Sequence, residues 1–98
     1  MKITKKQNGS ELSVALQGEL DTMTAPELEQ ELKEGLNDIT EITFDLSELN
    51  YISSAGLRVL LMAKRGMHYG GKVKVVNTNE IVREVFEVTG FADILDIE

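Results

Sequence analysis

The sequence predicts an α/β fold in one domain: an N-terminal antiparallel hairpin, parallel strands, and about three to four α-helices packed on a mixed β-sheet. Apolar and polar residues alternate over residues 12–16 and again over residues 42–46, which is the period of a strand with one buried face. Residues 41–76 follow the pattern strand, helix, strand, which implies parallel strands and a right-handed crossover. For a chain of 98 residues, one domain is the expected count.

The first two strands are expected to form the hairpin. Residues 2–6 are rich in lysine, which suits an edge strand because lysines discourage further pairing. Asn8 and Gly9 are a strong turn signal, and the alternating residues 12–16 follow as the antiparallel partner. This second strand should end at residue 18, where we expect a loop over residues 18–21.

The first helix is predicted from a start signal and a stripe of leucines. Residues 24–27 read Thr-Ala-Pro-Glu, a capping box with a proline in the first turn. Leu28, Leu32 and Leu36 recur every four residues and should form its buried face. We expect the helix to end at residues 37–38.

The second helix is expected to begin at a serine. The strand over residues 41–46 should be followed by a loop, and an apolar run then places Ser54 at the helix N-cap. The helix should end near Met67 or His68, because the following glycines at residues 70–71 readily adopt a left-handed turn.

The last part of the chain is predicted to add a strand and a helix. Residues 72–76 hold three valines and read as a strand. A third helix should start at Asn77 or Thr78 and end at residues 89–90, and residues 91–97 should form a brief helical turn or a last short strand. The residues expected to face the core here are Ile81, Val82, Val85, Phe86, Phe91 and Ile94.

Composition excludes several classes of function. The net charge of −7 argues against nonspecific nucleic-acid binding and against docking on anionic lipid. There is no cysteine, so neither disulfides nor thiolate metal sites are expected. The N-terminus lacks the apolar core of a signal peptide, and no stretch approaches the roughly 20 apolar residues of a membrane span. We therefore expect a cytoplasmic protein that binds neither nucleic acid directly nor membrane.

A polar cluster is expected where the parallel strands end, since ligands in open α/β sheets favour that edge. Its members would be Asp21, Asp45, Ser47, Ser53 and Ser54. A serine hydroxyl at a helix start lies beside unpaired N–H groups and suits a negative group. The alternative is purely structural: the serine caps the helix and the aspartates cap loops.

Catalytic interpretations are weak. A serine hydrolase needs a base, but the single histidine, His68, lies roughly 20 Å from Ser54 at about 1.5 Å per helical residue. The Gly-x-Ser-x-Gly elbow, the phosphate-binding loop and the dinucleotide-binding glycine fingerprint are absent. Asp21 and Asp45 lack further ligands for a metal. We expect no enzyme, no metal and no cofactor.

The second helix carries a second candidate surface. Arg58, Met62, Arg65 and Tyr69 are spaced by four, three and four residues and should share a face. Methionine and arginine on such a stripe are common in partner contacts, although a solvated face with a partly buried methionine is the alternative. The core face of this helix is expected to hold Leu57, Leu60 and Leu61.

Residues 44–61, Phe-Asp-Leu-Ser-Glu-Leu-Asn-Tyr-Ile-Ser-Ser-Ala-Gly-Leu-Arg-Val-Leu-Leu, resemble the signature of the STAS domain family of bacterial anti-sigma factor antagonists. The resemblance also covers residues 18–21 and 73–78, so it implies one STAS domain over residues 1–98. It further implies a switch protein that binds an anti-sigma factor serine kinase and thereby frees a sigma factor. The kinase then phosphorylates a serine of the antagonist, which dissociates, and a serine phosphatase resets it.

Matched on the motif glycine, the resemblance makes Ser54 the phosphoacceptor and places Asp21 near it, in contact with the kinase. Ser53 stands where many members have aspartate, which leaves a second hydroxyl that could compete as acceptor. Together with the helix stripe, the expected partner-binding residues are Asp21, Asp45, Ser53, Ser54, Gly56, Arg58 and Met62. A monomer is the expected state, although the sequence leaves dimer formation open.

Two other functions stay open from sequence. One is a STAS adaptor that is not phosphorylated, such as a stressosome-like scaffold or an accessory subunit of a lipid transporter. The other is a small hydrolase that uses Ser54, which the missing base disfavours.

Overall fold

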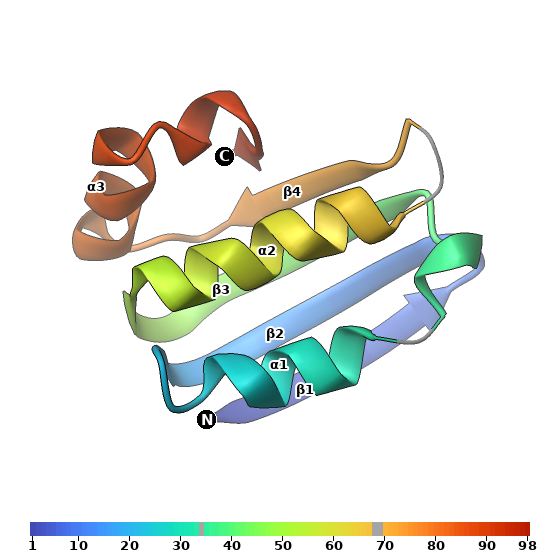
Figure 1. Ribbon diagram of the computed structural model, residues 1–98, viewed down its shortest axis with the longest axis horizontal. Helices are drawn as coiled ribbons and strands as arrows, with labels where there is room; N and C mark the ends of the chain where they lie inside the picture. Colours follow the sequence, from blue (N-terminus) through green and yellow to red (C-terminus); the bar gives the residue numbers. More distant parts are fainter. Residues whose placement is uncertain (34, 68–69) are drawn as a thin grey trace.

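A five-stranded sheet in the order β1-β2-β3-β4-β5 organises the computed structural model, which describes residues 1–33, 35–67 and 70–98 (Figure 1). β1 is antiparallel to β2, whereas β2, β3, β4 and β5 run parallel, so the predicted mixed sheet is confirmed. The elements in chain order are β1 (Lys2–Asn8), β2 (Glu11–Leu20), α1 (Ala25–Leu32), the 3-10 turn η1 (Leu36–Asp38), β3 (Glu41–Ile52), α2 (Ser54–Gly66), β4 (Lys72–Val76), α3 (Glu80–Val88), the 3-10 turn η2 (Phe91–Asp93) and β5 (Asp96–Ile97).

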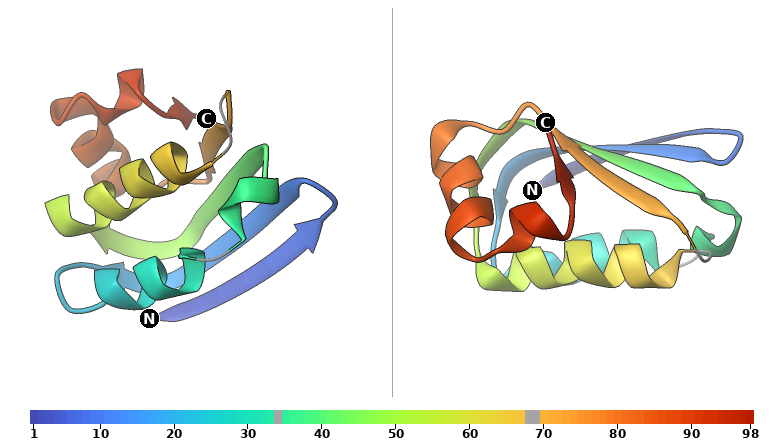
Figure 2. Two further views of the ribbon diagram at one scale, coloured as in Figure 1. Left: turned by 45° about the vertical axis from the view of Figure 1, so that its right-hand side comes forward. Right: turned by 90° about the horizontal axis from the view of Figure 1, so that it is seen from above.

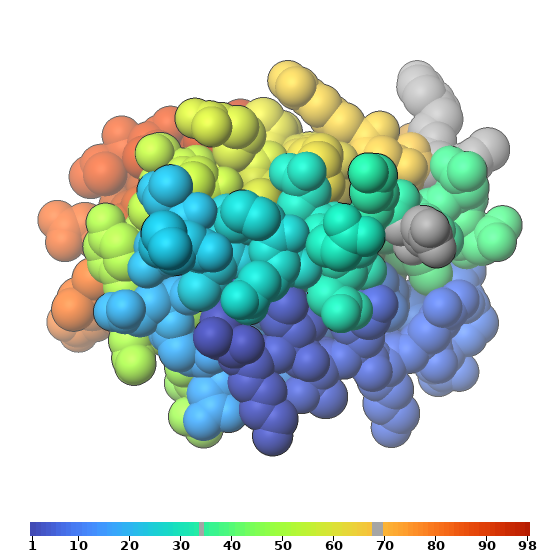
Figure 3. Space-filling view, turned by 60° about the horizontal axis from the view of Figure 1, so that its bottom comes forward, coloured from blue at the N-terminus to red at the C-terminus, as the bar shows by residue number. Residues whose placement is uncertain are grey.

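Helices α1 and α2 lie side by side on one face of the sheet, and α3 lies against its end beside β3 (Figures 1 and 2). The space-filling view shows α1, in cyan and teal, across the near face with β1, in blue, below it (Figure 3). The alternation in β2 explains this layering, because Val14 and Leu16 are buried under the helices while Ser13, Ala15 and Gln17 are exposed. No described helix combines the length and apolar character needed to span a bilayer.

The hairpin forms where the sequence predicts it. Asn8 pairs with Glu11, so the turn consists of Gly9 and Ser10, and Gly9 has a φ of 63° that suits glycine.

Both central strands run further than predicted. β2 continues to Leu20 and β3 to Ile52, and these two residues are paired at the end of the ladder. The pairing passes through two register shifts, between Ala15 and Gln17 and between Gly18 and Glu19. A bulge breaks the period-two pattern without ending the strand, so the predicted loops at these positions are wrong.

The first helix is shorter than predicted, because it ends at Leu32 and not at residues 37–38. Gly35 has a left-handed backbone, with φ 82°, and Leu36 enters the core from the 3-10 turn that follows. The predicted burial of Leu28, Leu32 and Leu36 is confirmed.

The second helix ends at Gly66, and Met67 has an extended backbone. His68, predicted near the helix end, and Tyr69, predicted on the helix stripe, lie outside the described residues. Of the three predicted core leucines, Leu57 and Leu60 are buried and Leu61 is half-buried.

The third helix begins later than predicted. Asn77 has a φ of 61°, which is not helical, and Asn79 provides the N-cap for a helix that starts at Glu80. Val82 and Phe86 are buried as expected, but Ile81 is 60% exposed. Both forms predicted for the C-terminal segment occur, as η2 and β5, with Leu95 and not Ile94 in the core.

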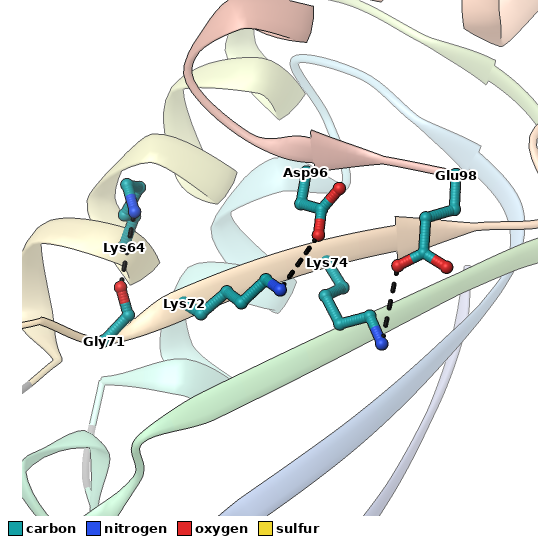
Figure 4. Close-up of polar contacts among 6 residues, drawn as sticks. All are labelled: Lys64, Gly71, Lys72, Lys74, Asp96 and Glu98. Atoms are coloured by element: carbon teal, nitrogen blue, oxygen red, sulfur yellow. Dashed lines mark hydrogen bonds and ion pairs between the residues drawn. The ribbon is translucent and has the colours of Figure 1, made fainter.

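Two ion pairs at the surface accompany the pairing of β5 with β4 (Figure 4). Lys72 Nζ lies 3.1 Å from Asp96 Oδ2, and Lys74 Nζ lies 3.4 Å from Glu98 Oε2. The hydrogen bond with Asp96 raises the pKa of Lys72. Both ion pairs are exposed, so they contribute little to stability and will weaken with salt.

Candidate functional site

The serine pair at the end of β3 marks the start of α2. Ser53 has an extended backbone (φ −103°, ψ 176°), and its carbonyl accepts a hydrogen bond from the N–H of Leu57 at 3.0 Å. Ser53 is therefore the N-cap residue, and Ser54 is the first residue of the helix. The prediction that Ser54 is the N-cap is wrong by one position, because β3 extends to Ile52 and the turn between strand and helix is a single residue.

The two hydroxyls differ in access. Ser53 Oγ is buried and has no hydrogen-bond partner among the described residues, and no side chain caps the first turn of α2. The side chain of Ser54 is exposed. A modifying enzyme can thus reach Ser54, whereas the Ser53 hydroxyl, predicted as a competing acceptor, is closed off in this conformation.

Close packing fixes where α2 begins. Gly56 is buried, and a Cβ atom built there would lie 2.7 Å from Leu20 Cγ and 2.9 Å from Ile52 Cγ1. Only a residue without a side chain lets the helix approach the ends of β2 and β3 this closely. Gly56 was predicted to contact a partner, but the structure places it in the core, where it positions Ser54.

Asp21 lies next to the serine pair. The N–H of Ser53 donates to the carbonyl of Leu20 at 2.9 Å, so the end of β2 and the start of α2 touch. Asp21 Oδ1 accepts from the N–H groups of Met23 at 3.0 Å and Thr24 at 3.1 Å. The backbone of Asp21 is therefore adjacent to the start of α2, while the closeness of its carboxylate to Ser54 stays a prediction.

The capping box predicted over residues 24–27 does not form. Thr24 has a helical backbone and its side chain makes no cap bond to the helix. Its hydroxyl instead donates to the carbonyl of Glu19 at 2.7 Å and accepts from the N–H of Asp21 at 2.9 Å. Asp21 and Thr24 together hold the loop that leads into α1.

Asp45 is not part of this cluster, contrary to prediction. It faces Ala15 on β2, and the strand from Ala15 to Leu20 separates it from the serine pair by roughly 17 Å at about 3.3 Å per residue. Its Oδ1 accepts from Asn77 Nδ2 at 3.1 Å and from the N–H of Ser47 at 3.0 Å. The Asn77 side chain, and then the Ser47 N–H, hold the pKa of Asp45 below its usual value of 3.8.

The extension of β3 explains why Asp45 and Ser47 are remote from Ser54. The sequence predicted a loop between residue 46 and Ser54, but residues 47–52 form the second half of β3. Asparagines that the sequence analysis did not single out bind this region, since Asn79 Nδ2 donates to the carbonyl of Leu49 at 3.1 Å. Their positions at the start of the predicted third helix were the only available signal.

Three residues of the predicted stripe, Arg58, Met62 and Arg65, line a groove of about 430 Å³ between α1 and α2, whereas the fourth, Tyr69, lies outside the described residues. The α2 wall contains Arg58, Val59, Met62 and Arg65, and the α1 wall contains Ala25, Pro26 and Glu29. Ala55, directly after Ser54, also lines it, so the groove begins beside the exposed serine. The α1 wall was not predicted, because only the packing of the two helices brings it opposite the stripe.

No group of three or more His, Cys, Asp or Glu side chains within residues 1–33, 35–67 and 70–98 is placed to hold a metal ion. The chemistry that these residues offer is an accessible hydroxyl at a helix start, one adjacent carboxylate and a partly apolar groove.

A family model described as Mlab, STAS domain, matches residues 3–96. Two relatives match nearly the whole chain. BtrV of Bordetella bronchiseptica, named as a candidate anti-sigma factor antagonist, is 38% identical over 99 residues that span 99% of this chain and 85% of that protein. The anti-sigma-B factor antagonist of Bacillus subtilis is 32% identical over 93 residues that span 94% of this chain and 85% of that protein.

Solved structures share the fold. An anti-sigma factor antagonist from Mycobacterium paratuberculosis aligns with a TM-score of 0.87 at 24% identity, over 98% of this chain and 83% of that chain. The Bacillus cell fate determinant SpoIIAA in its phosphorylated form aligns with a TM-score of 0.77 at 18% identity, over 99% and 91% of the two chains. At these identities the likeness establishes the architecture, which agrees with the α/β fold predicted from sequence.

Proposed function

We propose that this chain, which belongs to the STAS domain family, is an anti-sigma factor antagonist switched off by phosphorylation of Ser54. The family match confirms the resemblance that residues 44–61 indicated. In this proposal the unmodified protein acts in the cytoplasm, binds an anti-sigma factor serine kinase and so releases a sigma factor. A serine phosphatase resets it, and the chain itself catalyses no reaction. The names of the two relatives support the antagonist role.

The observation that carries the proposal is the contrast between the two serines. Ser54 is exposed at the first position of α2, while Ser53 Oγ is buried. No side chain caps the first turn of α2, so its N–H groups are available to a phosphate on Ser54. A phosphate can thus be accommodated without breaking the fold, and the phosphorylated structure of SpoIIAA shows that another protein of this fold carries one.

The same phosphate would oppose partner binding. It adds a charge of about −1.5 to −2 at neutral pH. Asp21, with its carboxylate at the adjoining loop, already makes this surface acidic. A docked partner would have to desolvate both charges, and a loss of about 1.4 kcal/mol lowers affinity tenfold.

Phosphosite mapping tests the proposal. The protein is incubated with its cognate anti-sigma kinase and ATP, and the modified residue is located by mass spectrometry. We expect phosphate on Ser54 in the wild type and in Ser53→Ala, the matched control, and none in Ser54→Ala. Normal phosphorylation of folded Ser54→Ala would refute the assignment.

A binding measurement tests the switch itself. Ser54→Asp should bind the kinase at least about tenfold more weakly than the wild type while it unfolds at the same temperature. Unchanged affinity would count against control by charge at this position.

A STAS adaptor that is not phosphorylated is the second candidate. The matching family model is named for Mlab and not for an anti-sigma factor antagonist, which favours this alternative. Co-purification of a membrane ATPase, together with no phosphorylation by any serine kinase of the host, would favour the adaptor role.

A further inference from the structure

We propose that the groove between α1 and α2 is the docking site for an acidic, partly apolar segment of a partner protein, and that Arg58 couples this site to Ser54. The inference rests on the proposed function, because it assigns the chemistry of the partner that Ser54 controls. It adds a specific receptor site and a specific residue through which a phosphate would act.

The α2 wall of the groove is cationic. α2 contains Arg58, Lys64 and Arg65 and no acidic residue, in a chain whose net charge is −7. Arg58 and Arg65 take part in none of the ion pairs formed among the described residues. Glu29 on the opposite wall is the acidic residue that lines the groove. Charge complementarity therefore favours a partner whose carboxylates reach the α2 side.

The remaining lining of the groove is largely apolar. Val59, Met62, Ala25 and Pro26 contribute to it, and Met62 is only half-buried. A methionine adapts its shape to the side chain that covers it. The matching partner segment is thus an amphipathic one that places an apolar side chain between the helices and acidic side chains toward Arg58 and Arg65.

Arg58 connects this groove with the serine. Ser54 and Arg58 are four residues apart on α2 and both are exposed, so they share a face with Cβ atoms about 6 Å apart. A phosphate on Ser54 would form an ion pair with Arg58 within its own helix. That pairing would neutralise the cation nearest the phosphate and place negative charge at the mouth of the groove, which repels an acidic segment.

Another copy of this chain is the main competing occupant. α3 is acidic, with Glu80, Glu84 and Glu87, and it exposes Ile81 and Val88, which are 60% and 74% accessible. This surface also contains Arg83, which is paired with Glu87 at 3.5 Å. Self-association through α3 would be head to tail and would produce rings or filaments, so it is detectable by size.

Binding to the cognate kinase provides the first test. Arg58→Glu and Arg65→Glu should each weaken binding by at least about tenfold and reduce its salt dependence. Arg83→Glu, on α3, is the matched charge control and should bind as the wild type does. Wild-type affinity in both groove variants would overturn the inference and leave the proposed function standing. Absence of any binding by the wild type would instead overturn the proposed function, and the inference with it.

A second test needs no kinase. Phosphoserine is incorporated at position 54 during translation, and the phosphate pKa, near 6 for free phosphoserine, is followed by phosphorus NMR. Arg58→Gln should raise this pKa by about 0.3 units or more relative to the phosphorylated wild type, whereas Arg65→Gln should not. Equal values in all three proteins would refute the role of Arg58. Oligomers of the unmodified wild type that Arg58→Glu abolishes in sedimentation experiments would identify a second copy as the occupant and overturn the assignment to a partner.

Discussion

The starts of α2 and α3 are held in different ways, although each helix follows a parallel strand. At α3, Asn79 Oδ1 accepts from the N–H of Val82 at 2.8 Å, and its Nδ2 donates to the carbonyl of Leu49 at 3.1 Å. At α2, the Ser53 hydroxyl makes no bond among the described residues. The α3 start is therefore closed by its own side chain, whereas the first turn of α2 stays open to an acceptor from outside.

The two helix starts show what anchors a helix whose first turn has no side-chain cap. α2 is anchored by backbone hydrogen bonds at Ser53 and by the close approach at Gly56. α3, which carries no proposed site, uses the side-chain cap that is the usual solution. The following predictions test whether packing at one helix start and capping at the other have these separate roles.

The largest expected effect is at Gly56. Gly56→Ala should lower the free energy of unfolding by about 1–3 kcal/mol, because its Cβ would overlap Leu20 and Ile52. Gly66→Ala is the matched control, since its Cβ would meet only the end of the Leu36 side chain, at 3.2 Å. Urea unfolding measures both, and equal stabilities would show that packing does not position α2.

Removal of the α3 cap should be the next largest change. Asn79→Ala should cost about 1–2 kcal/mol, since the N–H of Val82 and the carbonyl of Leu49 both lose a partner. Asn79→Asp keeps the acceptor for Val82 but not the donor to Leu49, so it should recover only the part of this loss that comes from the cap. Thermal unfolding distinguishes the variants, and an Asp variant as unstable as the Ala variant would contradict a capping role.

Ser53→Ala should change the free energy of unfolding in the opposite direction from Asn79→Ala. Because the hydroxyl is buried without a partner, its removal should leave the free energy of unfolding unchanged or raise it by up to about 1 kcal/mol. Ser54→Ala, at an exposed position, should be neutral. If Ser53→Ala lost as much stability as Asn79→Ala, Ser53 would cap α2 in solution. The two helix starts would then not differ in the way proposed.

The smallest expected effect is on the pH dependence of stability, through Asp45, which binds the segment before α3. Asn77 holds the pKa of Asp45 in the folded protein below 3.8, and Asp45 in turn fixes the segment before α3. The stabilisation that ionised Asp45 contributes is therefore complete above about pH 5, and it is lost as the pH falls through the pKa of Asp45 in the folded protein. Asp45→Asn should flatten the acid limb of stability measured between pH 6 and pH 2, by an amount that solvent screening keeps small. An unchanged acid limb would contradict this role for Asp45.

The sequence alone predicted those elements that a few neighbouring residues specify. The hairpin that turns directly after Asn8, the buried Leu28 and Leu32 of α1 and the valine-rich strand β4 appear in the structure as predicted, because neighbouring residues alone specify the period and the turn. The motif around Ser54 led to the correct family by the same local route. The predicted end of β3 was wrong, because extra residues in β3, between Asp45 and Glu48 and between Leu49 and Tyr51, interrupt the period-two pattern and hide the length of the strand.

By itself the sequence determined the fold class, the family and the short stretch that contains the site. Only the tertiary structure decided which serine is open, that Gly56 belongs to the core, and that Asp45 lies away from Ser54. It also placed the α1 wall opposite Arg58 and Met62. The physical reason is that burial and proximity depend on how strands pair and helices pack over long sequence separations, and a register shift of one residue reverses which side chain is exposed.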